Sequence, residues 1–227
     1  MIKLGNIAIL AGGLPIVAVF SAYYIAVSNG HVPSCMPLLE GCTSISATGR
    51  ASPESLFFRA TMIPSAMLMM FYWYLMTQWL VRIVTNKSRY FYLVFILGLV
   101  SSVFLIAYTV ALGFIDPLYG LQRRVGVTLF FSCALIAQLM VSNIVFKAVK
   151  SGKLSLPYNL HYWLVIICGI MLLTGLCTIP ASIYFSHVST LDNIIEWNYA
   201  VVMYLFYIVT GIIWRVTDFR MEFHVGR

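Results

Sequence analysis

Residues 90–112 read YFYLVFILGLVSSVFLIAYTVAL and contain no Asp, Glu, Lys or Arg. A helix needs roughly 20 consecutive apolar residues to cross the hydrocarbon core of a bilayer. The whole chain is 61% hydrophobic and 9% charged, whereas a soluble domain carries roughly 25% charged residues. The uncharged run therefore predicts a membrane-spanning helix, and the composition predicts a polytopic membrane protein.

Five further apolar runs of similar length flank this one and use nearly all of the 227 residues. The first run is longer than the roughly 7–15 apolar residues of a signal-peptide core, so we expect it to be retained as a helix. We predict an all-α bundle of six membrane-spanning helices, in a single domain over residues 1–227. The helices are expected at about 7–27, 55–81, 90–112, 125–146, 160–185 and 196–214.

The chain has a net charge of +7, and its basic residues lie mainly at the ends of the apolar runs. Basic residues placed there fix topology and meet anionic lipid head groups, so we predict membrane lipids as partners and no nucleic acid. With the N-terminus inside, ten basic residues lie inside and four outside, which predicts cytoplasmic termini. The ten are Lys3, Arg82, Lys87, Arg89, Lys147, Lys150, Lys153, Arg215, Arg220 and Arg227; the four are Arg50, Arg59, Arg123 and Arg124. The sequence does not indicate whether the protein lies in the plasma membrane or in an endomembrane.

The longest polar interruption is GHVPSCMPLLEGCTSISATGRASPESLFFR, residues 30–59, which this topology places outside as one structured loop. Two cysteines in it, Cys35 and Cys42, can form a disulfide in an oxidising compartment. Such a crosslink would stabilise the loop by about 2–3 kcal/mol. The alternative is a pair of free thiols in a reducing compartment.

The end of this loop carries the residues of a helix start. Ser52 is a suitable cap, Pro53 fits the first helical turn, and Glu54 faces the positive end of the helix dipole. We therefore expect the second span to begin here.

A candidate lipid-headgroup or partner-binding site lies in the same loop. Hydroxyls and backbone donors of a turn at residues 44–49, together with Glu54 and Arg59, could hold a phosphate, which Arg binds in bidentate fashion. The structural alternative is that these groups only cap the helix and fix the loop. The turn contributes Ser44, Ser46 and Gly49.

Glu196 and Trp197 are predicted to open the sixth helix at the outer boundary. The helix dipole favours Glu at this position and Trp anchors at head-group level, which accounts for both residues without a function. A further hypothesis pairs Glu196 with Arg59 or with Arg123 and Arg124, so these four residues, together with Trp197, join the candidate site.

Two short motifs resemble the DRAM family (damage-regulated autophagy modulators), whose relatives include the FRAG-type proteins of GPI-anchor remodelling. They are Gly30-His31-Val32 with Ile45-Ser46, Thr48-Gly49 and Pro53-Glu54-Ser55, and the run from Glu196-Trp197 to Phe219. The resemblance implies a role in membrane organisation and lipid handling. Where the family often has His-Asp at the start of the fourth helix, this chain has Arg123-Arg124. We therefore do not expect Arg123-Arg124 to have an acid–base or metal role that the family's His-Asp pair would have.

Catalytic and metal-binding signatures are not found in the sequence. The chain has no Gly-x-Ser-x-Gly elbow, phosphate loop or dinucleotide fingerprint. Metal and haem sites need several ligands at one depth, which His31, His161, His187 and His224 do not supply. We therefore predict no metal, no cofactor and a non-catalytic protein that engages lipids or partner membrane proteins through its outer face. The alternatives are a lipid-remodelling acyltransferase using Ser46, Glu54 or Arg59, and an accessory subunit of a larger membrane complex.

Overall fold

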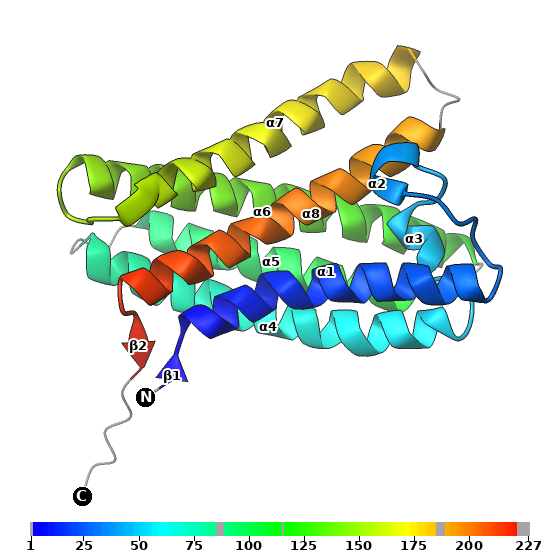
Figure 1. The fold of residues 1–227 in the computed structure, drawn as a ribbon, viewed down its shortest axis with the longest axis horizontal. Helices are drawn as coiled ribbons and strands as arrows, with labels where there is room; N and C mark the ends of the chain where they lie inside the picture. The colour runs from blue at the N-terminus through cyan, green and yellow to red at the C-terminus, as the bar shows by residue number, and fades with distance from the viewer. Residues whose placement is uncertain (1, 85–88, 115, 185–188, 222–227) are drawn as a thin grey trace, which may run out of the picture.

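The structure is a computed structural model that describes residues 2–84, 89–114, 116–184 and 189–221, and it is a bundle of long helices (Figure 1). Six helices in the described ranges are long and apolar enough to cross a membrane, which confirms the predicted fold class. They are α1 (Gly5–Ser28), α4 (Glu54–Ile83), α5 (Arg89–Ala111), α6 (Pro117–Lys150), α7 (Leu160–Tyr184) and α8 (Ser189–Val216). The minor elements are α2 (Pro37–Glu40), α3 (Ile45–Thr48), the 3-10 helix η1 (Pro157–Asn159) and an antiparallel pair, β1 (Ile2–Lys3) with β2 (Arg220–Met221).

The two ends of the bundle differ in what they carry. The β1–β2 pair, the end of α4 and the end of α6 lie at one end, on the left in Figure 1, which we call the basic end. Residues 29–53, with α2 and α3, lie at the opposite end, which we call the loop end. This separation matches the predicted alternation of spans, although Lys87 and Arg227 lie outside the described residues. That the basic end faces the cytoplasm stays a prediction.

The core runs through the whole bundle and is rich in aromatic side chains, several of which lie between α4 and α8. Tyr72, Trp73 and Trp214 are fully buried, and the rings of Tyr72 and Trp214 stack with centroids 5.3 Å apart. The Tyr72 hydroxyl contacts the Thr210 hydroxyl at 3.2 Å. A Cβ added to Gly98 of α5 would lie 2.2 Å from the Trp73 ring, so this glycine admits the indole.

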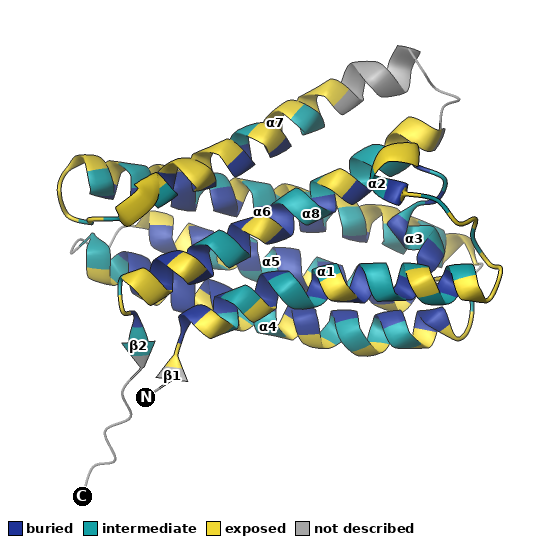
Figure 2. Cartoon of the chain, viewed as in Figure 1, coloured by how far each residue is buried: buried dark blue, intermediate teal, exposed yellow. Residues whose placement is uncertain are grey.

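Apolar side chains also cover the outside of the bundle. Figure 2 shows exposed residues along the outer faces of the helices, and these include Leu10, Val17 and Leu173. Water would penalise so many exposed apolar groups, whereas lipid tails accept them. The surface therefore suits a bilayer.

The fourth spanning helix, α6, begins at Pro117 instead of the predicted residue 125. The Asp116 carboxylate accepts the Leu118 N–H at 2.8 Å and Pro117 occupies the first turn, which starts the helix early. The prediction treated charged residues as helix ends, but a helix can continue beyond the hydrocarbon core. Arg123 and Arg124 consequently lie inside α6.

The sixth spanning helix, α8, also begins earlier than predicted, at Ser189 instead of residue 196. Glu196 is therefore seven residues inside the helix, about 10 Å along its axis at 1.5 Å per residue. The fifth, α7, ends at Tyr184, and the predicted last residue, 185, lies outside the described residues.

Candidate functional site

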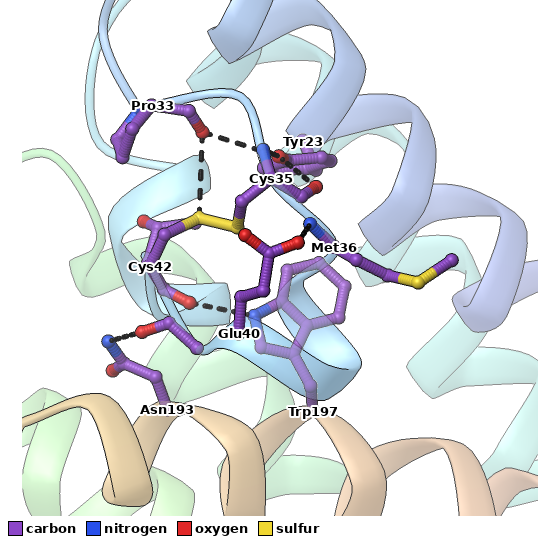
Figure 3. The surroundings of a disulfide bond; sticks show 10 residues. Tyr23, Pro33, Cys35, Met36, Glu40, Cys42, Asn193 and Trp197 are labelled. Atoms are coloured by element: carbon purple, nitrogen blue, oxygen red, sulfur yellow. Dashed lines mark hydrogen bonds between the residues drawn. A yellow bond between two sulfur atoms is a disulfide. The ribbon is translucent and has the colours of Figure 1, made fainter.

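A disulfide closes the loop at the loop end. Cys35 and Cys42 are joined with Cα atoms 6.4 Å apart, which confirms the predicted crosslink (Figure 3). Between them, the Glu40 carboxylate accepts the Met36 backbone N–H at 3.0 Å and fixes the single turn of α2. The loop is therefore a compact lobe.

Side chains of α8 hold this lobe on the bundle. Loop carbonyl groups near a membrane need hydrogen-bond donors, because lipid supplies none. α8 provides three: Asn193 to the Gly41 carbonyl at 2.8 Å, the Trp197 indole N–H to the Thr43 carbonyl at 2.9 Å, and Asn198 to the Leu38 carbonyl at 2.8 Å.

Gly41 permits the close approach that these bonds require. Its φ is +59°, in the left-handed region, and a Cβ there would lie 2.2 Å from the Thr190 carbonyl oxygen. Any side chain at Gly41 would push the lobe away from α8.

Trp197 lies beneath the lobe, as Figure 3 shows. It is fully buried and packs against Phe20 at 5.2 Å and Tyr23 at 5.8 Å between ring centroids. The Tyr23 hydroxyl in turn bonds both the N–H and the carbonyl of Cys35 at 2.8 Å. Trp197 was predicted as a head-group anchor at the helix start, but it is an internal anchor between α8, α1 and the loop.

The predicted turn at residues 44–49 contains α3. The Ser44 hydroxyl accepts a backbone N–H of α3 at 3.1 Å and caps it. The Ser46 hydroxyl contacts Ser44 at 3.1 Å and accepts a bond from Arg50 at 3.2 Å. Gly49 is buried against the core. In this conformation both serine hydroxyls have partners within the loop.

Glu54 is fully buried and bonds His31 Nδ1 at 2.6 Å. Its other oxygen, Oε2, has no hydrogen-bond partner among the described residues. The predicted Ser52 cap is wrong: Pro53 holds the cap position of α4, without a side-chain hydrogen bond. Sequence reasoning missed the pair because its members lie 23 residues apart; the one signal was that both belong to the family motifs.

Two of the candidate arginines stabilise the connection between α5 and α6. Arg59 donates to the Leu112 carbonyl and lies over the Phe114 ring at 5.2 Å. Arg123 donates to the Phe114 carbonyl at 2.9 Å. Arg124 is exposed, with no hydrogen bond or ion pair to the described residues.

Glu196 faces the loop and not the arginines predicted as its partners. None of those three forms an ion pair with it in the described part of the chain. Glu196 and Ile45 of α3 instead line the same small hollow between α8 and the loop.

An open groove of about 310 Å³ lies beside Glu196, between α6, α7 and α8. Its polar lining is Asp192 and Glu196 from α8 and Thr128 and Ser132 from α6, and Tyr199 supplies part of its wall. Figure 1 shows α7 diverging from α6 toward the loop end, where this groove lies. Asp192 was missed as a site residue because only the packing of three helices brings it to the groove.

Metal-binding groups do not gather in the described residues. No set of three His, Cys, Asp or Glu side chains is placed to hold an ion there. His31 and Glu54 provide two ligands, fewer than a structural or catalytic zinc site uses. His187 and His224 lie outside the described residues.

Comparison with known proteins shows which family the chain matches. No curated protein and no solved structure matches the chain. A family model described as the Frag1/DRAM/Sfk1/Cwh43P N-terminal domain matches residues 4–214, a range that takes in the structured loop and nearly all of the six spans. The match agrees with the resemblance seen in the two sequence motifs. The chain therefore belongs to the Frag1/DRAM/Sfk1/Cwh43P N-terminal domain family.

Proposed function

We propose that this multi-pass membrane protein is non-catalytic and engages a membrane lipid through the groove at its loop end. The observation that carries the proposal is Glu196, an acidic side chain well inside a spanning helix and bordering a groove. Ionisable residues in membrane spans are costly, so they are retained mainly where they bind something.

The chemistry of the groove favours a lipid whose head group carries hydrogen-bond donors. Asp192 and Glu196 offer carboxylate acceptors, and the apolar wall suits the upper part of an acyl chain. Arg124 lies one helical turn outward from Thr128 on α6, and its guanidinium, which bonds none of the described residues, can bind a phosphate. A phosphoethanolamine head group meets both requirements.

The combined Asp192→Asn and Glu196→Gln substitution tests this proposal. We expect it to weaken phosphatidylethanolamine binding about tenfold, because hydrogen bonds to charged groups are worth about 1.5–3 kcal/mol. Native mass spectrometry of the detergent-solubilised protein, titrated with phosphatidylethanolamine or phosphatidylcholine, measures the change. The matched control is Glu40→Gln, which removes a loop-end carboxylate outside the groove.

Equal binding of the two lipids, or an unchanged affinity in the double variant, would reject this lipid site. Co-purification of a second membrane protein that is lost in the same variant would instead support the accessory-subunit alternative.

A second candidate function, lipid acyl transfer, is favoured by the His31–Glu54 pair. With Nδ1 bonded to a carboxylate, the Nε2 atom of a neutral imidazole can accept a proton from an attacking hydroxyl. Ser46 bonds Ser44 and Arg50 and not this histidine, so the hydroxyl would belong to the substrate.

If this second function holds, His31→Ala should lower acyl release from a phospholipid with a labelled acyl chain by about 10²–10⁴-fold. His161→Ala, at the basic end, is the control that should retain release. If the wild-type protein releases no label, it does not catalyse acyl release from this phospholipid.

A further inference from the structure

A large hollow lies at the basic end, away from every residue of the predicted site. It is an apolar crevice of about 720 Å³ between the end of α4, the start of α5 and the end of α6. Its walls include Tyr90, Leu93, Met140 and Ile144. Its volume lies in the range of about 300–1,000 Å³ that is typical of small-molecule sites.

Three polar side chains of the crevice have no partner among the described residues. Asn143, Lys147 and Lys153 are exposed and form no side-chain hydrogen bond or ion pair with the described residues. Asn143 and Lys147 are four residues apart, so they lie on one face of α6, about 6 Å apart along its axis. An amide at this depth, beside lipid tails, needs a partner that lipid tails cannot provide.

The end of α6 brings Lys153 to the same crevice. Gly152 has a φ of +73°, and the N–H groups of Gly152 and Lys153 bond the carbonyls of Val149 and Ala148, each at 3.0 Å. This is a Schellman motif, which reverses the chain after the helix. The reversal places Lys153 beside the last turn, where Lys147 lies.

Two other basic residues at this end are already engaged. Arg82 lies over the Phe219 ring at 5.2 Å, and Arg215 donates to Asn6 Oδ1 at 2.6 Å. The two crevice lysines are thus available to an anion.

We propose that this crevice binds an anionic phospholipid, with the phosphate between Lys147 and Lys153 and an acyl chain along the apolar wall. Asn143 would donate to an ester oxygen below the phosphate. A second apolar hollow of about 320 Å³ shares Tyr90 and Leu93 and is bordered by Arg89, which gives the second acyl chain a path along α5. Anionic lipids are enriched in the cytoplasmic leaflet, the side that the charge distribution predicts for this end.

The test is native mass spectrometry of the full chain titrated with phosphatidylglycerol, phosphatidylcholine or inorganic phosphate. We expect Lys147→Gln with Lys153→Gln to bind phosphatidylglycerol about thirtyfold more weakly, because each of the two lysines contributes about one kcal/mol near a charged surface. Lys150→Gln removes the same charge from the same last turn, but Lys150 does not line the crevice, so binding should persist. Ile144→Trp keeps both lysines and should block binding by filling the crevice.

Three results would overturn the proposal. The first is unchanged affinity in the double lysine variant, and the second is an equal loss in Lys150→Gln, which would indicate diffuse surface charge. The third is phosphatidylglycerol binding that is abolished by inorganic phosphate but unchanged in Ile144→Trp. That result would indicate a phosphate site without lipid. The Asp192 and Glu196 variant should bind phosphatidylglycerol normally, so this site and the loop-end groove are tested separately.

Discussion

Replacing Trp197 with alanine is expected to lower the free energy of unfolding by about 3–5 kcal/mol, the range for removing a fully buried Trp. The indole is fully buried, packs against Phe20 and Tyr23, and donates to the Thr43 carbonyl at 2.9 Å. Its loss leaves both a cavity and an unpaired carbonyl beneath the loop. Thermal unfolding in mild detergent measures the effect, and the variant loop should also be cleaved faster by trypsin at Arg50.

Two companion variants separate the causes. Trp197→Phe keeps most of the packing and loses only the hydrogen bond, so it should cost about 1 kcal/mol. Trp163 is 54% exposed on α7, and Trp163→Ala should change stability little. If Trp163→Ala is as damaging as Trp197→Ala, the anchor role assigned to Trp197 is wrong.

The second large effect is expected at adjacent glycines of α1. A Cβ on Gly12 would lie 2.4 Å from the Tyr204 carbonyl oxygen of α8, whereas a Cβ on Gly13 would meet nothing within 4 Å. Gly12→Ala should therefore separate α1 from α8 and cost about 1–3 kcal/mol. Gly13→Ala should be neutral or stabilise the protein by up to about 1 kcal/mol, because alanine favours helix.

This pair has its control built in, since both substitutions add one methyl group to the same helix. Melting temperatures in the same detergent compare them directly. Equal shifts in the two variants would mean that the close packing of α1 against α8 does not decide stability.

The positions of the candidate residues in the bundle were predicted in part. The sequence placed the loop, Glu54, Arg59 and Glu196 at one end of the bundle, where the structure also has them. It did not indicate that Arg59 binds the Leu112 carbonyl, or that Glu54 pairs with His31. The crevice at Lys147 was also not predicted, because its walls come from three helices that only packing brings together.

The sequence by itself determined the number of spans, the loop and its disulfide, because these depend on local quantities. Whether residues 90–112 enter a bilayer depends only on the free energy of transferring that run from water to the bilayer. The disulfide depends on two cysteines, Cys35 and Cys42, that are close in the chain. Which residues meet across the bundle was decided only by the tertiary structure, as for Trp197 and Thr43, 154 residues apart. The physical reason is that lipid-facing and core-facing sides of a spanning helix are both apolar. Periodicity therefore does not indicate which side turns inward, and close contacts such as Gly12 with Tyr204 set the rotation instead.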